Sequence, residues 1–126
     1  MSRLTWPKER RLRKRPEFVH CYEQGKKHHT RHFILFIFRR DGGPDGLRLG
    51  LTVSRKMGNA VARNRIKRVV REVFRLHQHT FESPLDVVVI PKRNLKTTQL
   101  NLALATEEFV PFFERRLLRN NSDERK

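Results

Sequence analysis

Basic side chains recur at helical spacing in the middle of the chain. The row at steps of four and its neighbours on the same stretch are Arg63, Asn64, Arg65, Lys67, Arg68, Arg71 and Arg75. Like charges four residues apart repel each other on a helix, so a merely solvated helix face has no reason to carry one sign only. Guanidinium groups can pair with two phosphate oxygens at once, so the row predicts a polyanionic partner and favours a nucleic acid.

The helix that carries this row is predicted to run from about residue 60 to residue 76. Asn59 is a typical N-cap residue and comes directly before it. Ile66, Val70 and Val73 recur at steps of three and four, so they share one apolar face. The same helix therefore offers one face to a core and another to a partner.

The acidic residues are few and scattered. Five of them fall in a glycine-rich turn, at the start of a predicted strand and in the first turn of a predicted helix: Asp41, Asp45, Asp86, Glu107 and Glu108. A metal-dependent nuclease needs carboxylates that converge on two ions about 4 Å apart. The sequence therefore predicts a binding surface, with no catalytic residue and no metal site of its own.

The histidines and the single cysteine leave minor alternatives. His28, His29 and His32 are predicted to share a loop and could form a metal site, although phosphate contact or solvent exposure fits them better. Six histidines also leave open a general acid–base nuclease. Cys21, the only cysteine, is predicted to be a small buried hydrophobe rather than a nucleophile.

A length of 126 residues indicates a single domain over residues 1–126. The net charge of +16 and the pI of about 11.4 point to nucleic acid or an anionic membrane surface. The longest apolar run, Phe33 to Phe38, is far shorter than the roughly 20 residues of a membrane helix. No signal-type segment follows the basic N-terminus, so a cytoplasmic protein is expected. The basic arm at 1–11 and the polar tail at 120–126 are expected to be flexible.

Three apolar runs predict strands. Phe33 to Arg39 is apolar on both faces, whereas Leu47 to Ser54 alternates apolar residues with small or polar ones. The glycine-rich turn at 41–46 makes these two runs a predicted hairpin. Leu85 to Ile90 is the third run, so the helix at 60–76 is predicted to join two parallel strands in a βαβ unit.

Two further helices complete the predicted fold. A short helix has Pro16 in its first turn and ends at Gly25, and a longer one starts after Asn101 with Pro111 inside it, where a kink is possible. The predicted fold class is α+β, a two-layer α/β sandwich with about four strands and three helices.

Aromatic residues give a second candidate surface. Phe18 and Tyr22 lie four residues apart on the short helix, where they are either core residues or a platform on which unpaired bases stack. The small and polar face of the run at 47–54 suggests that one sheet face is partly an open groove. Phe36 and Thr52 are candidates to line that groove.

The residues of the basic stretch also carry a family resemblance. Gly50–Lys56 runs into Gly58–Val61 and then into Arg63–Arg68, and this pattern resembles the signature of the bacterial ribonuclease P protein component. Arg63, Asn64 and Arg65 correspond to the centre of that family's RNR motif. The match is long, ungapped and specific, and the pattern extends from about Leu12 to about Arg116.

The resemblance implies a subunit of ribonuclease P, a ribonucleoprotein endonuclease that removes the 5′ leader of precursor tRNA. Catalysis is then expected in the RNA subunit with bound Mg²⁺, and the expected partners are that RNA and precursor tRNA, with no membrane and no required protein oligomer. The implied RNA contacts are Arg55, Lys56, Arg63, Asn64, Arg65, Lys67, Arg68 and Arg71, and the implied 5′-leader cleft is Phe18, Tyr22, Phe36, Thr52 and Ser54. The resemblance also implies a left-handed βαβ crossover, against the general rule. The alternative is a ribosomal or RNA-chaperone protein without an enzyme role.

Overall fold

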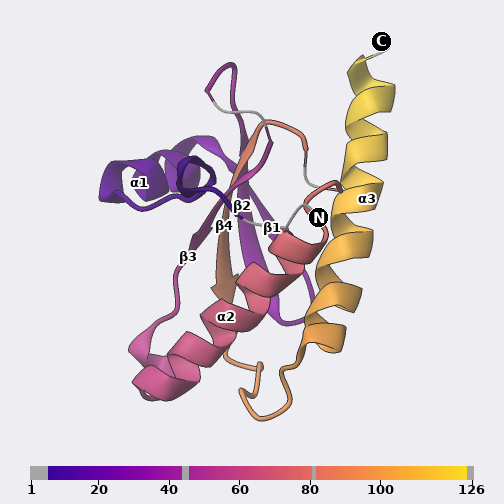
Figure 1. The fold of residues 1–126 in the computed structure, drawn as a ribbon. Helices are drawn as coiled ribbons and strands as arrows, with labels where there is room; N and C mark the ends of the chain where they lie inside the picture. The colour runs from indigo at the N-terminus through magenta and orange to yellow at the C-terminus, as the bar shows by residue number, and fades with distance from the viewer. Residues whose placement is uncertain (1–5, 44–45, 81, 125–126) are drawn as a thin grey trace.

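The computed structural model describes residues 6–43, 46–80 and 82–124, and the side chains as far as residue 115. Its elements in chain order are η1 (Lys8–Arg10), α1 (Arg15–Gln24), β1 (Lys26–His29), β2 (Phe33–Arg39), β3 (Arg48–Leu51), η2 (Arg55–Met57), α2 (Ala60–Leu76), β4 (Leu85–Pro91) and α3 (Leu102–Glu124). Figure 1 shows α2 and α3 packed beside the sheet. The predicted fold of three helices and four strands is confirmed. None of the described helices is long and apolar enough to span a membrane.

The four strands form one mixed sheet in the order β1-β2-β4-β3. β2 pairs with both β1 and β4 in antiparallel fashion, and β3 pairs with β4 in parallel fashion. The predicted hairpin between 33–39 and 47–54 is therefore wrong, because β4 lies between β2 and β3. The physical reason is burial: six of the seven residues of β4 are buried, so β4 occupies a position where neighbouring strands cover both of its edges.

The predicted βαβ unit is confirmed, since β3 and β4 are parallel neighbours joined through α2. In Figure 1 both strands run downward, β4 lies to the right of β3, and α2 crosses in front of them. This arrangement is a left-handed crossover, as the family resemblance implies and contrary to the usual preference.

The edge strand β1 was not predicted, and it corrects the interpretation of the histidines. His28 and His29 lie in this strand rather than in a loop, where His29 pairs with Ile34 and His28 with Leu35. Lysines and histidines make up all four residues of β1, and such polar residues discourage further strand pairing at a sheet edge. The absence of an apolar pattern explains why the sequence gives no strand signal here.

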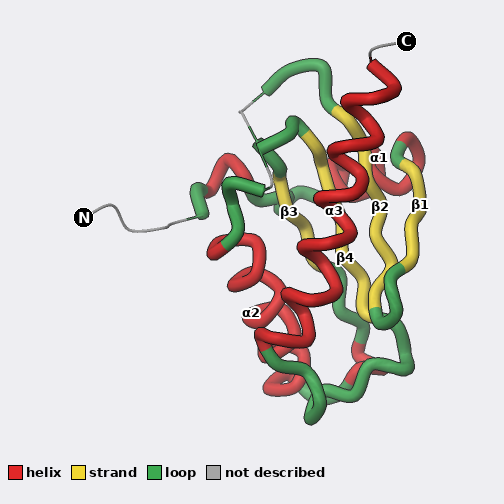
Figure 2. Tube along the Cα trace, turned by 90° about the vertical axis from the view of Figure 1, so that its right-hand side faces the viewer, coloured by secondary structure: helices red, strands yellow, loops and turns green. Residues whose placement is uncertain are grey.

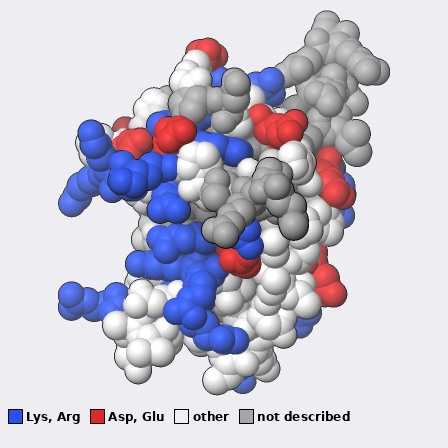
Figure 3. Space-filling model, in the orientation of Figure 1, with Lys and Arg blue, Asp and Glu red and all other residues white. Residues whose placement is uncertain are grey.

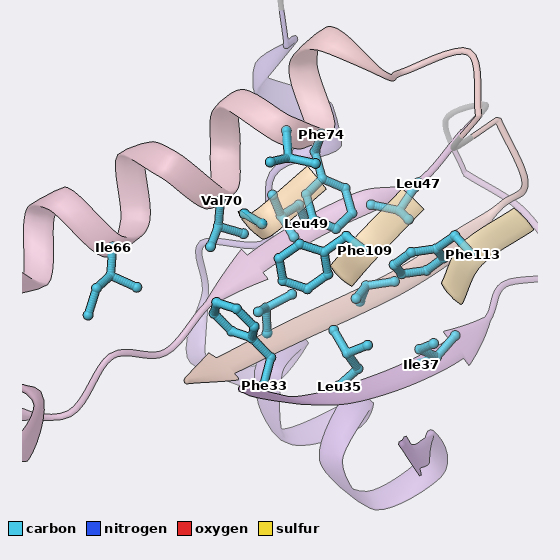
Figure 4. Close-up of a cluster of buried hydrophobic side chains, with 14 of the residues drawn as sticks. Phe33, Leu35, Ile37, Leu47, Leu49, Ile66, Val70, Phe74, Phe109 and Phe113 are labelled. Carbon is cyan, nitrogen blue, oxygen red and sulfur yellow. The ribbon is translucent and has the colours of Figure 1, made fainter. Parts of the chain in front are cut away.

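The main core lies between one face of the sheet and the helices α2 and α3 (Figure 4). Its buried residues include Phe33, Leu35, Ile37, Leu47, Leu49, Ile66, Val70, Val73, Phe74, Val87, Val89, Ala105, Phe109 and Phe113. The aromatic rings interlock, with centroids 4.7 Å apart for Phe33 and Phe109 and 5.5 Å apart for Phe74 and Phe109. The core thereby fixes α2 with its opposite side turned outward.

Helix α1 covers part of the other sheet face, as the side view in Figure 2 shows. A second, smaller cluster joins Leu12, Cys21 and Val88 there, with Phe18 and Tyr22 packed against it. Pro16 lies in the first turn of α1 and Gly25 is its C-cap, as predicted. A side chain at position 25 would meet the Cys21 carbonyl oxygen at 2.5 Å, so the end of α1 requires glycine.

Candidate nucleic-acid interface

The start of α2 is set by Gly58 and Asn59. Gly58 has φ +132°, which disfavours any other residue, and a Cβ there would lie 2.9 Å from the Cβ of Ala62. The Asn59 side chain accepts a hydrogen bond from the Ala62 backbone N–H at 2.9 Å, so the predicted N-cap is confirmed. Together they fix the helix register, and with it the direction in which every basic side chain of α2 points.

The predicted two faces of α2 are present. Ile66, Val70, Val73 and Phe74 are buried, whereas the basic residues are exposed or half-buried. In Figure 3 the blue Lys and Arg side chains gather in a band on the left of the molecule, while the side of α3 is mostly white. We call six residues of α2, Arg63, Asn64, Arg65, Lys67, Arg68 and Arg71, the cationic face.

Two arginines of the RNR motif have different surroundings. The Nη2 of Arg65 donates to the Leu100 carbonyl oxygen at 2.9 Å, so this guanidinium also ties α2 to the loop before α3. The Nε of Arg63 is buried and has no hydrogen-bond partner among the described residues. A buried N–H without an acceptor is stabilised more by a new hydrogen bond than an N–H that already has one.

Basic residues from η2 and from the loop after β4 extend the cationic surface beyond α2. Arg55 and Lys56 lie in η2 and are exposed. A hollow of about 630 Å³ has as its lining Lys56, Met57, Arg93, Leu95, Lys96 and Thr97. Arg93 and Lys96 were not among the predicted site residues, although a basic loop after an apolar strand could have indicated them.

The predicted aromatic residues come together on the sheet face opposite the main core. The rings of Tyr22 and Phe36 meet edge to face at a centroid distance of 4.9 Å. The Tyr22 hydroxyl shares a hydrogen bond with the Thr52 hydroxyl at 2.9 Å. Phe18 rests on Gly50, where a Cβ would lie 2.8 Å from the ring, so glycine at position 50 makes room for Phe18. We call Phe18, Tyr22, Phe36 and Thr52 the aromatic patch.

Phe18 and Tyr22 are in part core residues, because each side chain is half-buried. One side of each packs on the cluster around Cys21 and Val88, and the rest remains accessible. Ser54, the fifth predicted residue, lies just before η2 and is exposed.

An ion-pair network holds α1 on the sheet, and sequence reasoning missed it. Arg48 of β3 binds both carboxylate oxygens of Asp86 at 2.7 Å and also reaches Glu17 of α1 at 3.2 Å. Arg40 adds a contact to Asp86 at 3.2 Å. The hydrogen bonds that Arg48 donates to the Asp86 carboxylate raise the pKa of its guanidinium. The sequence gives one indication of this network, which is the acid Asp86 inside an otherwise apolar strand.

Cys21, His28 and His32 contact other residues of the fold. Cys21 is fully buried, its Sγ donates to the Phe36 carbonyl oxygen at 3.2 Å, and burial raises the pKa of its thiol to about 12. A thiol with that pKa is not a nucleophile near neutral pH. His32 pairs with Glu108 at 3.0 Å, whereas His28 meets Phe112 edge to face. Over the described ranges, no three His, Cys, Asp or Glu side chains are grouped as metal ligands.

Comparison with known proteins gives one consistent result. A family model described as Ribonuclease P matches residues 6–117. The chain is 54% identical to the ribonuclease P protein component of Maridesulfovibrio salexigens over 111 residues, which is 88% of this chain and 90% of that relative. It is 48% identical to that of Oleidesulfovibrio alaskensis, over 80% of this chain and 81% of the relative.

Solved structures agree with the sequence comparison. The RNase P protein from Thermotoga maritima is similar with a TM-score of 0.75 and 32% identity, covering 83% of this chain and 96% of that one. The RNase P protein from Staphylococcus aureus is similar with a TM-score of 0.64 and 29% identity, covering 89% of this chain and 92% of that one.

Proposed function

Because the chain belongs to the ribonuclease P protein family, we propose that it binds the catalytic RNA of ribonuclease P and the 5′ leader of precursor tRNA. In this role it assists the endonucleolytic cut that produces the mature 5′ end of tRNA. We assign the catalytic RNA to the cationic face of α2 and the leader to the aromatic patch. The proposal rests mainly on one observation. The basic residues of α2 lie on one side of the helix and face outward, because the apolar residues of the opposite side are buried in the core.

We place the hydrolysis in the RNA subunit, where bound Mg²⁺ supplies the metal-ion chemistry. Two acids near the proposed RNA surfaces already pair with basic side chains of the protein. Asp86 is committed to Arg40 and Arg48, and Glu72 pairs with Arg75. These carboxylates neutralise protein cations, so the remaining contribution of the chain is binding and positioning.

The cationic face supports assembly for an electrostatic reason. A catalytic RNA and an RNA substrate repel each other, and a protein of net charge +16 between them reduces that repulsion. The aromatic patch adds contacts that only the uncut substrate can make, because the product has lost its leader. The protein then favours substrate over product. We expect it to act in the cytoplasm, as one copy without a protein partner.

Reconstitution from purified components tests the proposal. We expect the protein alone to leave precursor tRNA intact, the RNA subunit alone to cut it only at high Mg²⁺, and the two together to cut it at low Mg²⁺. Cleavage by the protein alone would contradict the assignment of catalysis to RNA. A protein that neither cuts nor assists would instead support the ribosomal or RNA-chaperone alternative.

The aromatic patch gives a prediction about the leader. Phe36→Ala should weaken binding of precursor tRNA to the holoenzyme by about 5- to 150-fold, since stacking contributes about 1–3 kcal/mol per base. Binding of mature tRNA should not change, because it has no leader. The measurement is the equilibrium affinity of the assembled holoenzyme for both RNAs.

Tyr22→Phe is the matched control for that variant. It keeps the ring that meets Phe36 and removes only the hydroxyl that bonds to Thr52. We expect the selectivity for precursor over mature tRNA to survive this change largely intact. Equal loss of affinity for both RNAs in Phe36→Ala would show that the ring supports the fold and does not contact the leader.

A further inference from the structure

The segment from Trp6 to Leu12 is fixed along the open edge of β3. Leu12 donates its backbone N–H to the Leu49 carbonyl oxygen at 2.9 Å, and Arg11 forms a parallel bridge with Leu49. The Trp6 indole N–H donates to the Arg10 carbonyl oxygen at 2.8 Å, and its ring meets Phe74 edge to face. Residues 6–11 of the predicted arm are therefore packed on the fold, whereas residues 1–5 lie outside the described part.

This packing places Arg11 next to the cationic face of α2. A small cavity of about 120 Å³ has as its lining Trp6, Arg11, Leu49, Arg71, Glu72 and Arg75. Two of these lining residues, Arg75 and Glu72, pair with each other. Arg11 uses its Nη2 for one hydrogen bond to the Trp6 carbonyl oxygen at 3.3 Å. The cavity thus joins a guanidinium from the N-terminal segment to one from α2.

The two guanidinium groups interact unfavourably. Partial burial and then the charge of Arg11 lower the pKa of Arg71. Glu72 is the single acid in the lining, and its pairing with Arg75 leaves its charge already balanced. Holding two cations together in this way reduces the stability of the fold, so the arrangement suits an anion that binds between them.

We propose that this cavity binds one backbone phosphate of the catalytic RNA, with Arg11 as an RNA contact supplied from outside α2. The inference rests on the proposed function of the cationic face and extends that face onto the N-terminal segment. A phosphate is favoured over a base because the Trp6 ring is already covered by the Arg10 guanidinium, 4.2 Å from its centroid. Two guanidinium forks match the oxygens of a single phosphate.

The proposal predicts opposite effects on folding and on RNA binding. Arg11→Gln removes the repelling charge and keeps a donor for the Trp6 carbonyl oxygen, so the urea midpoint should stay unchanged or rise. Binding of the catalytic RNA should weaken by roughly 5- to 10-fold at 0.1 M salt, and the slope of log affinity against log salt should become shallower by about 0.9. A residue with a merely structural role would lower the urea midpoint instead.

Three comparisons make the test specific. Arg115→Gln removes the same charge from an exposed position on α3 and should leave the slope unchanged. Arg11→Lys keeps the charge, so the slope of log affinity against log salt should equal that of the wild type. Its affinity for the catalytic RNA should still be lower than that of the wild type. A single-stranded leader oligonucleotide serves as the second ligand, and its affinity should be the same for Arg11→Gln and the wild type.

An unchanged slope with the catalytic RNA would overturn the inference, as would a loss confined to the leader oligonucleotide. A lower urea midpoint with an unchanged slope would make Arg11 a structural residue. These results leave the proposed function intact, because it fails only if the wild-type protein itself neither binds the catalytic RNA nor assists cleavage.

Discussion

Replacing Arg63, Lys67 and Arg68 with glutamine is expected to weaken binding of the catalytic RNA by roughly 10²- to 10³-fold at 0.1 M salt. Each phosphate contact contributes about 0.7 to 0.9 to the slope of log affinity against log salt, so three lost contacts flatten the slope by about two to three. If the wild-type protein neutralises about 6–8 phosphates, its own slope should be roughly −4 to −7. The loss should be largest at low salt and shrink as salt rises.

The measurement is RNA affinity across a salt series, together with urea unfolding of the free protein. The triple variant should fold at least as well as the wild type, because the substitutions remove like charges from one helix. Cleavage at saturating protein should be restored, since these residues bind the RNA and are not catalytic. A slope equal to that of the wild type would mean that the cationic face does not contact phosphates.

Asp86→Ala should lower the free energy of unfolding by about 3–5 kcal/mol, the usual cost of removing one partner from a buried ion pair. Asp86 is 3% exposed and binds two arginines, one of which, Arg40, is 8% exposed. Its loss removes the carboxylate that the buried Arg40 and the half-buried Arg48 share. Because Arg48 also reaches Glu17, the variant should loosen α1 and so disturb the aromatic patch that α1 helps to form.

Urea unfolding of the free protein checks this prediction, and Glu82→Gln provides the control. Glu82 pairs with His79 on the surface, where the side chains are 73% and 84% exposed, so its loss should barely change stability. A loss of stability in Asp86→Ala no larger than that of the control would show that the buried network is not what holds α1. The selectivity of the holoenzyme for precursor over mature tRNA should fall in Asp86→Ala, as it should in Phe36→Ala.

Local sequence patterns predicted the parts of the site that one helix can encode. Spacing at three and four residues placed Ile66 and Val70 inside and the basic row outside, and Asn59 marked the first residue of the helix. The aromatic residues were also predicted, although their contact with each other depends on the packing of α1 against the sheet. These predictions succeeded because neighbours on a helix are fixed by backbone geometry alone.

The sequence by itself therefore determined the helix at 60–76, its cap, its one-sided charge and the apolar strands that bury its other face. The tertiary structure decided the placement of β4 between β2 and β3, the pairing of Asp86 with Arg40 and Arg48, and the meeting of Arg11 with Arg71. The reason is physical. Residue spacing shows which face of an element is apolar, whereas the choice of strand neighbours depends on which edges and faces the whole chain leaves to be covered.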